Sequence, residues 1–432
     1  MPGSGRKESR VKIVIFGLGY VGFTAACCIA SEGHKVTGID VNEKKVAAIM
    51  RGETPIVEPL VGDMLQAGLG KGLITATTEI NGPLDEADLA IVCVGTPSAA
   101  DGSHNMGFIA EVSRQIAIAL QPGRKHPLTV AYRSTIRPGS IDELIEPIFR
   151  SILGGERMGD VELVYNPEFL REGSAVKDYF EPPKIVIGTK DGLPNAPMSA
   201  LNKNISATTF IVGYREAEIT KLVDNSWHAL KVAFANEIGR LCLQLGIKAS
   251  KVHEIFVSDT KLNISPYYTR PGGAFGGSCL PKDVRALQYI AADCGANTHL
   301  IDALLRSNEA HKHKIYEHIS QGLAPGAKVL LAGLAFKAAT DDLRESPNVD
   351  LARKLLAAGF DLEIFDPAID ASKLIGANLG YAFSQLPTLE GILVTKNHAQ
   401  KTHYARIIAT NATIRQLSLV ENAIVMDISA LA

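Results

Sequence analysis

The chain has 432 residues, of which 46% are hydrophobic and 21% charged, and its formal net charge is −2. This length exceeds what one hydrophobic core usually supports, so we expect two or three domains. The ordinary composition and near-neutral charge indicate neither a nucleic-acid partner nor a membrane partner. No apolar run is long enough to span a bilayer, and residues 1–10 lack the apolar core of a secretory signal, so we expect a disordered tail there.

Cysteines are at positions 27, 28, 93, 242, 279 and 294, without a CxxC pair or regular spacing. We therefore expect reduced thiols and a cytoplasmic protein, because a chain of this size does not need disulfide bonds for stability. Most of them lie in apolar patterns, where cysteine acts as a small hydrophobic residue. Cys279 instead lies in a loop, after glycines and before Lys282 and Asp283. Since no His or Cys stands at ligand spacing from Cys279, we predict no metal site.

Strand-like and helical segments alternate from residue 11 onwards. The pattern predicts helices beginning near Val21 and Asn42, and strands over 11–17, 35–40, 89–95, 128–135 and 162–168. Such alternation is typical of a parallel sheet wrapped by helices, the doubly wound α/β class. Ligands bind at the carboxyl ends of the strands in this class. We therefore predict a Rossmann domain over residues 11–205.

The first predicted strand is followed by GLGYVG, in which Gly17, Gly19 and Gly22 open a helix, and Asp40 ends the next strand. This spacing is that of a dinucleotide-binding fingerprint. The glycines let backbone N–H groups approach a pyrophosphate at the helix amino terminus, and Asp40 can accept hydrogen bonds from ribose hydroxyls. The carboxylate should repel a 2′-phosphate, which favours NAD over NADP. The alternative is a glycine turn that only packs the helix on the strand.

A long helical pattern covers residues 214–245, with apolar residues at helical spacing. A helix of this length can reach from one domain to another. We assign residues 206–310 to a small, central helical domain and 311–324 to a linker. A second series of strand, glycine turn, helix, strand and aspartate then repeats the first, so residues 325–432 are predicted to form another Rossmann-like domain.

Two clusters of polar residues are candidates for catalysis. Lys221, Asn225 and His228 share one face of the long helix, although a solvated stripe would have the same spacing. Glu168 and Glu172 follow a strand and suit an acid–base pair, although acidic residues are also common where a helix begins.

Two further clusters can be interpreted either as functional groups or as incidental features of the structure. Lys282 would lower the pKa of the Cys279 thiol and so activate it, unless the cysteine is incidental. Lys337 and Arg344 suit a phosphate, unless they form surface ion pairs.

Together these segments resemble the nucleotide-sugar 6-dehydrogenase family, which contains the UDP-glucose and GDP-mannose dehydrogenases. The likeness covers about residues 11–375 and rests on GLGYVG, GTPS, RSTIRPG, NPEFLREGSAVKD, ITKLVDNSWHALKVAFANEIG, GGAFGGSCLPKD and GLAFKAATDDLRESP. Within the family, three stretches of this chain look closest to the GDP-mannose members: SWHALKVAFANEIG, SPYYTRPGGAFGGSCLPKDVRAL and AATDDLRESP.

The resemblance implies oxidation of the sugar C6 alcohol to a carboxylate by two NAD molecules in turn, without release of the aldehyde. Cys279 would capture the aldehyde as a thiohemiacetal and then carry a thioester. Lys221 and Asn225 would hold the C6 oxygen. Glu168 would act as general base or position the hydrolytic water, ordered by Thr135 and Asp283.

The resemblance also assigns the binding residues. NAD contacts fall, besides the glycines, to Tyr20, Val21, Asp40, Lys45, Thr96 and Thr135. Sugar-nucleotide contacts fall to Glu172, Lys221, Asn225, His228, Asn236, Tyr267, Tyr268, Arg270, Lys282, Lys337 and Arg344. The family further implies at least a homodimer, with the long helix paired between subunits and Arg270 reaching the neighbour's site.

Some alternatives stay open. Lys261 stands where many UDP-glucose members carry arginine, which favours GDP-mannose, with UDP-glucose or a UDP-N-acetylhexosamine as the alternative substrate. Residues 383–432 match no pattern of the family, so base contacts from there are unassigned. A single-step NAD-dependent hydroxyacid dehydrogenase would need no nucleophilic cysteine, and a nucleotide-binding module without activity would need none of the catalytic groups.

Overall fold

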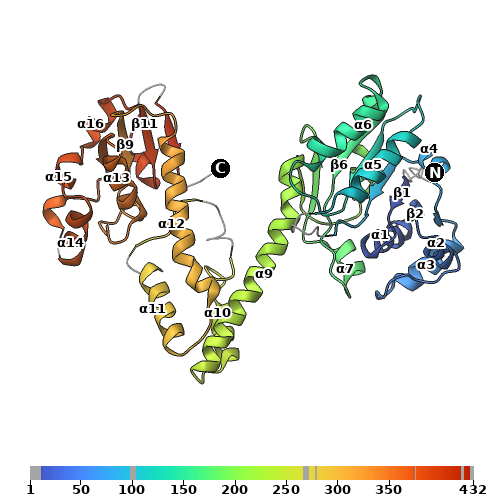
Figure 1. The fold of residues 1–432 in the computed structure, drawn as a ribbon, viewed down its shortest axis with the longest axis horizontal. Coiled ribbons are helices and arrows are strands. Elements are labelled where there is room, and N and C mark those ends of the chain that lie inside the picture. The colour runs from blue at the N-terminus through green and yellow to red at the C-terminus, as the bar shows by residue number, and fades with distance from the viewer. Residues whose placement is uncertain are drawn as a thin grey trace, which may run out of the picture. The chain divides into compact units, whose positions relative to one another are not determined.

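A computed structural model describes residues 11–97, 104–265, 272–277, 280–374, 376–419 and 423–428. The chain divides into a first unit that ends at His228 and a second unit that begins at Ala229. Figure 1 labels the helices and strands of each.

The sheet of the first unit has the strand order β3-β2-β1-β4-β5-β6-β7-β8. Its strands are Lys12–Phe16 (β1), Lys35–Ile39 (β2), Ile74–Thr77 (β3), Leu89–Val92 (β4), Leu128–Tyr132 (β5), Val161–Tyr165 (β6), Ile185–Thr189 (β7) and Thr209–Gly213 (β8). Strands β1 to β6 follow the 3-2-1-4-5-6 order of a doubly wound dinucleotide-binding sheet, which confirms the predicted class. Strand β7 pairs antiparallel with β6. Strands β3, β7 and β8 are additions to the predicted ones.

Helices cover both faces of this sheet. They are Tyr20–Ser31 (α1), Glu43–Met50 (α2), Val61–Gly70 (α3), Asn81–Asp85 (α4), Gly107–Ala119 (α5), Glu146–Leu153 (α6), Ala175–Phe180 (α7) and Ala196–Leu201 (α8). Along β1, Ile13 and Ile15 pack in the core that contains α1, whereas Val14 and Phe16 pack in the core that contains α5. Successive side chains of β1 lie in different cores, and both cores are apolar. The strand is therefore apolar at consecutive positions and not only at alternate ones.

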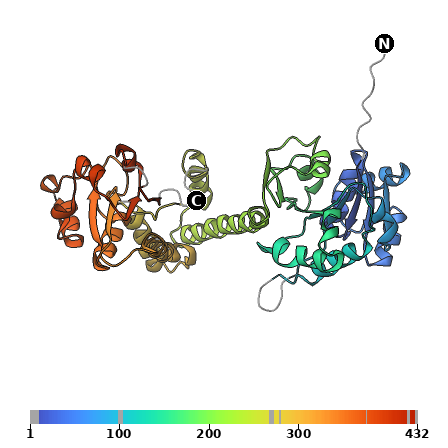
Figure 2. The same cartoon turned by 90° about the horizontal axis from the view of Figure 1, so that it is seen from above.

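Helix α9 (Tyr214–Gln244) runs without a break through 31 residues, as predicted (Figures 1 and 2). In the first unit its buried Glu218 accepts hydrogen bonds from the backbone N–H groups of Gly139 and Ile141. In the second unit its buried Glu237 accepts from the backbone N–H of Leu300 (2.8 Å), at the start of α12 (His299–Ser320). Each glutamate therefore satisfies backbone donors at the beginning of another helical segment.

The second unit contains a parallel sheet with the order β10-β9-β11-β12. Its strands are Lys328–Ala332 (β9), Asp361–Phe365 (β10), Arg406–Ala409 (β11) and Val425–Asp427 (β12). Its helices besides α9 are Ala249–Ser258 (α10), Leu280–Asp293 (α11), His299–Ser320 (α12), Pro347–Ala357 (α13), Gly376–Gln385 (α14), Leu389–Ile392 (α15) and Lys396–Lys401 (α16). The second Rossmann-like domain is therefore present.

The two sheets repeat one local arrangement, as the sequence suggests. The N–H groups of Gly17 and Gly333 donate to the last residue of β2 (2.8 Å) and of β10 (2.9 Å). Asp40 and Asp366, the residues after these strands, each accept from the backbone of the glycine turn (2.9 and 2.8 Å). Both glycines have positive φ, of 91° and 105°, which a residue with a Cβ rarely adopts.

The predicted linker at 311–324 is wrong for most of its length, because α12 continues to Ser320. Two apolar residues stand four positions apart among the charged residues of this segment. Ile315 and Ile319 are both buried in the core of the second unit. Residues 321–327 alone connect α12 to β9.

Among the described residues, no helix combines the length and the apolarity needed to cross a membrane.

Candidate active site

The glycine turn after β1 provides a cradle for a dinucleotide. A Cβ on Gly22 would lie 1.9 Å from the carbonyl oxygen of Gly17, and one on Gly17 would lie 3.0 Å from the carbonyl oxygen of Cys93. These two glycines therefore let α1 pack on the sheet. A Cβ on Gly19 would meet nothing within 4 Å, so this face of the turn is open to a ligand. The turn fits a pyrophosphate at the amino terminus of α1.

Asp40 lies at the carboxyl end of β2, where the ribose of a dinucleotide is expected. Its carboxylate accepts hydrogen bonds from the backbone N–H of Leu18 (2.9 Å) and from Lys45 Nζ (2.6 Å). Burial alone would raise the pKa of Asp40, but the hydrogen bonds from Lys45 and the backbone outweigh it and hold the pKa below its usual value. An ionised acceptor is thus fixed in place for ribose hydroxyls.

Two other predicted cofactor residues meet at the neighbouring strand ends. The Thr96 hydroxyl donates to the backbone carbonyl of Thr135 (2.8 Å), which joins the loops after β4 and β5. Tyr20 begins α1, and its hydroxyl donates to Glu58, a residue that the sequence did not single out. Val21 follows in the first turn of the same helix and is half-buried.

Lys221 and Glu168 form an ion pair, although they come from different sequence motifs. Lys221 Nζ lies 3.0 Å from Glu168 Oε1, and their side chains are 12% and 14% exposed. Glu168 also accepts a hydrogen bond from the backbone N–H of Leu170 (2.6 Å). The pair places a cation and a carboxylate together, partly removed from water. This arrangement can stabilise negative charge on a substrate oxygen and accept a proton beside it.

An aromatic ring and a second ion pair surround these groups. The ammonium of Lys221 lies 5.6 Å from the centroid of the Phe169 ring, and that of Lys184 lies 4.9 Å from it. Lys184 is paired with Asp224 of α9 (2.7 Å). Asp224 falls within the long helix that the sequence predicts, whereas Lys184 directly precedes β7 and has no sequence signal.

The other predicted residues of the first unit lie on its surface. Asn225 and His228 are exposed on α9, one and two turns after Lys221, and Glu172 is exposed in the loop after β6. These exposed polar side chains near the Lys221 pair are available to a ligand, and within the described ranges of the chain no hydrogen bond holds them toward the pair.

In the second unit, the predicted charged residues Lys282 and Arg344 pair with neighbours. Lys282 Nζ contacts Asp283 (2.6 Å), at the start of α11. Arg344 makes a two-point contact with Asp342, with both distances 2.9 Å. Lys337 is exposed in the same loop as Arg344, and Asn236 is exposed on α9. Cys279, Tyr267, Tyr268 and Arg270 lie outside the described residues.

The segment 272–277, just before the Cys279 motif, is held by α12. Asn308 accepts from the backbone N–H of Phe275 (3.0 Å) and donates to the carbonyl of Phe275 (2.8 Å). His311 Nε2 lies 2.7 Å from the carbonyl oxygen of Gly272. A Cβ on Gly276 would lie 2.4 Å from the carbonyl oxygen of Glu345, so this glycine is needed for close packing. Asn308 and His311 are further site-supporting residues that no sequence motif revealed.

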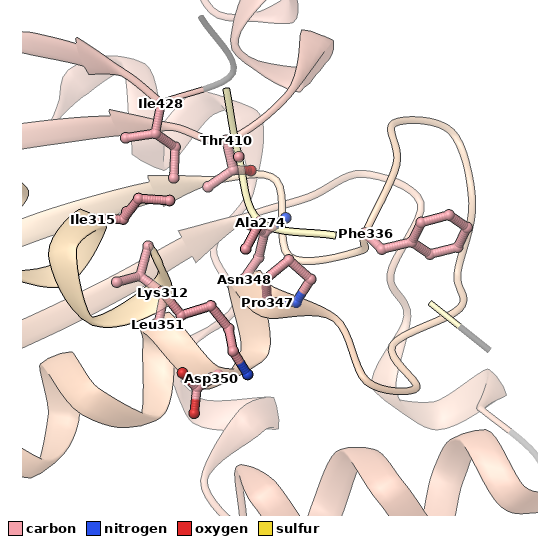
Figure 3. Close-up of a pocket in the computed structure, with 11 residues that line it drawn as sticks. Ala274, Lys312, Ile315, Phe336, Pro347, Asn348, Asp350, Leu351, Thr410 and Ile428 are labelled. Atoms are coloured by element: carbon pink, nitrogen blue, oxygen red, sulfur yellow. The ribbon is translucent and has the colours of Figure 1, made fainter. Parts of the chain in front are cut away.

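A cavity of about 220 Å³ lies at the carboxyl ends of β9 and β11 in the second unit. Figure 3 shows Asn348, Thr410 and Ala274 around it, with Lys312 beside Asp350 and Phe336 on the far side. The strand order reverses between β9 and β11, and ligands of parallel sheets bind at such points. The cavity is therefore the candidate ligand site of this unit.

A dinucleotide cradle, a partly buried lysine–glutamate pair and a second Rossmann-like unit define an NAD-dependent dehydrogenase with a second ligand-binding domain. Family models match residues 11–206, 215–310 and 330–431, described as the NAD binding, central and UDP binding domains of the UDP-glucose/GDP-mannose dehydrogenase family. The third match includes residues 383–431, so the prediction that this stretch matches no pattern of the family is wrong. The chain belongs to this family of oxidoreductases, which act on nucleotide sugars.

Individual relatives agree with this assignment. The GDP-mannose 6-dehydrogenase of Pseudomonas putida is 41% identical over 384 residues, covering 89% of this chain and 87% of the relative. The UDP-glucose 6-dehydrogenase of Pseudomonas aeruginosa is 32% identical, covering 84% of this chain and 80% of the relative. A crystal structure of a ternary complex of GDP-mannose dehydrogenase from Pseudomonas aeruginosa matches with a TM-score of 0.89 and 37% identity, covering 96% of each chain.

Proposed function

We propose that the protein oxidises the C6 alcohol of GDP-mannose to the carboxylate of GDP-mannuronate. The observation that carries the proposal is the higher identity to GDP-mannose 6-dehydrogenases, 41%, than to a UDP-glucose 6-dehydrogenase, 32%, over similar spans. Lys261, at a position where many UDP-glucose members carry arginine, supports the same choice.

Two NAD molecules, bound in turn, would each accept one of the two hydrides that this four-electron oxidation releases. In the first oxidation, Glu168 takes the hydroxyl proton, directly or through water, while the Lys221 ammonium stabilises the developing oxyanion. The 3.0 Å ion pair supports these roles, because it places the proton acceptor beside the cation. Asn225, one turn further along α9, would donate to the same oxygen.

The Cys279 sulfur then adds to the aldehyde carbon and forms a thiohemiacetal. Loss of the second hydride and of the hydroxyl proton from the thiohemiacetal leaves a thioester, which water cleaves to release the acid and restore the thiol. Glu168 would position this water, with Thr135 and Asp283 ordering it. Cysteine capture explains why no aldehyde needs to leave the site between the two oxidations.

The remaining sugar-nucleotide contacts are proposed from the family resemblance. They fall to Glu172, His228, Asn236, Tyr267, Tyr268, Arg270, Lys282, Lys337 and Arg344. Polar contacts can separate the axial C2 hydroxyl of mannose from the equatorial one of glucose, because the wrong isomer leaves buried groups unpaired.

The test is a comparison of kcat/KM for GDP-mannose and UDP-glucose at saturating NAD, with the NADH yield for each sugar. We expect a preference for GDP-mannose and two NADH per sugar. A preference for UDP-glucose would overturn the substrate, and one NADH per sugar would overturn the two-step reaction.

The nucleophile has a separate test. Cys279→Ala should abolish formation of the acid while NAD still binds, and Cys294→Ala, at a free and half-buried cysteine, is the matched control with unchanged turnover. More than a trace of acid from the Cys279 variant would contradict the covalent mechanism.

We further propose that the active protein is at least a homodimer, in which α9 pairs with its counterpart and Arg270 reaches the neighbour's site. In support, Ile219, Val223, Trp227 and Leu230 form an apolar stripe along α9, and each is at least 42% exposed. Contiguous exposed apolar surface usually marks an interface. Sedimentation at assay concentration should show a dimer or larger assembly, and an active monomer would contradict the proposal.

A cytoplasmic location is also proposed. The described cysteines at positions 27, 28, 93, 242 and 294 are all free, which supports a reducing compartment. Fractionation of the native host with a cytoplasmic marker would test this.

A further inference from the structure

Glu58 lies in the irregular connection between α2 and α3, yet its side chain is buried. One carboxylate oxygen, Oε2, accepts from the Tyr20 hydroxyl and from the backbone N–H of Gly173 (2.7 Å). The other, Oε1, accepts from the backbone N–H of Ala175 (2.8 Å). A single carboxylate thus collects donors from two segments more than 150 positions apart.

The two segments belong to different parts of the site. Tyr20 directly follows the glycine turn and begins α1, where the dinucleotide is expected. Gly173 and Ala175 end the loop that follows β6 and carries Glu168 and Glu172. At this loop end α7 begins, and Ser174 makes no side-chain cap for it, so Glu58 provides the missing acceptor.

The start of the same loop is fixed by independent contacts. Glu168 is held by Lys221 and by the backbone of Leu170, and Arg171 is paired with Asp178 (2.7 Å). Glu58 joins the loop to the cofactor side of the unit, where the N–H of Gly173 also donates directly to the Tyr20 hydroxyl oxygen (3.3 Å).

We infer that Glu58 is a positioning residue, which ties the cofactor turn to the loop carrying Glu168 and Glu172. Because Tyr20 and Gly173 share one oxygen, a shift of either segment changes the hydrogen bond of the other. NAD seated against the start of α1 is therefore expected to restrain residues 168–176. This role concerns the cofactor alone and does not depend on which sugar nucleotide is oxidised.

The protonation states suit a permanent link. Burial would raise the pKa of Glu58, but the hydrogen bonds from Tyr20 and the backbone hold it below its usual value. Burial and the bond to Glu58 raise the pKa of Tyr20 to about 12. The carboxylate stays an acceptor and the phenol stays a donor throughout the neutral range.

Hydrogen exchange of the full chain, with and without NAD, tests the link. In the unmodified protein we expect NAD to slow exchange across residues 168–176. Glu58→Gln offers one acceptor oxygen in place of two, so the amides of Gly173 and Ala175 should exchange about tenfold faster or more, and NAD should no longer slow them. In the same variant, kcat should fall and KM for NAD should rise, each about tenfold.

Glu53→Gln is the matched control, because Glu53 lies on the same connection but is exposed, and its carboxylate pairs with Arg51 (2.8 Å). It should behave as the unmodified protein in both measurements. If Glu58→Gln does not fold, Tyr20→Phe serves instead. It removes the two hydrogen bonds of the Tyr20 hydroxyl, to Glu58 and from the Gly173 N–H, and should weaken the NAD effect on 168–176 while Ala175 stays protected. Equal slowing by NAD in the unmodified protein and in the variant that folds would overturn the inference, whatever the substrate proves to be.

Discussion

Replacing Gly22 by alanine tests how α1 packs on the sheet. The new Cβ would lie 1.9 Å from the carbonyl oxygen of Gly17 and 3.0 Å from the Cβ of Cys93. Carbon and oxygen approach to about 3.3 Å without a clash, so α1 would have to move by roughly 1.4 Å. The inner face of α1 is buried over residues 22–30, and this movement would disturb it along its length.

The cost should reach about 3 kcal/mol, the upper part of the usual range for an overpacked core. For a unit of this size, that corresponds to a fall of about 6–12 °C in Tm. Calorimetry of the full chain without NAD measures this, with the transition of the first unit followed separately. Gly22→Ala with an unchanged Tm would refute the packing argument.

Gly19→Ala is the matched substitution in the same turn. Its Cβ would meet nothing within 4 Å, so Tm without NAD should change by no more than about 2 °C. The methyl group would occupy the space of the pyrophosphate, so NAD affinity, measured by titration calorimetry, should fall about tenfold or more. Normal NAD binding by this variant would show that the cradle is elsewhere.

Three further outcomes are expected. Lys221→Met should lower kcat by about 10²–10³-fold in an NADH assay, because the loss of one oxyanion donor has an effect of this size. A fall in kcat of under about tenfold would exclude Lys221 from the mechanism. Leu60→Gly should raise Tm by a few degrees, because the φ of 70° at Leu60 costs about 1–2 kcal/mol for a residue with a Cβ. A lower Tm would show that the exposed Leu60 side chain contributes more to stability than the strain costs. Because the pKa of Tyr20 is raised from 10.0 to about 12 on folding, its contribution to stability is complete below pH 10.0 and lost as pH rises toward about 12. Tyr20→Phe should therefore lose less stability than the unmodified protein over that pH interval, and equal losses would contradict the assigned bond.

The sequence alone was sufficient to predict the features that depend on local geometry. Gly17, Gly19 and Gly22 could be found because a turn between strand and helix has a fixed spacing, and α9 because its apolar residues keep helical spacing over many turns. The pairing of Lys221 with Glu168 could only be expected through the family resemblance, since no spacing relates a helix to a loop more than fifty residues earlier.

Other features have no signal in one sequence. Glu58 stands in a connection without periodicity, and its donors come from two distant segments. Strand β8 carries exposed residues such as Thr209 and Phe210 at the sheet edge, so it lacks the apolar run of the central strands. The predicted linker failed because charged residues outnumber Ile315 and Ile319 in that part of α12.

The ion pair between Asp40 and Lys45 has an evolutionary consequence. The carboxylate that repels a 2′-phosphate and the ammonium that would attract one are 2.6 Å apart. Asparagine at position 40 would still offer an acceptor to the Leu18 N–H, but it would leave the Lys45 charge unopposed. Aspartate and asparagine codons differ by a single nucleotide. A single base change would thus separate a site that favours NAD from one that we expect to accept NADP.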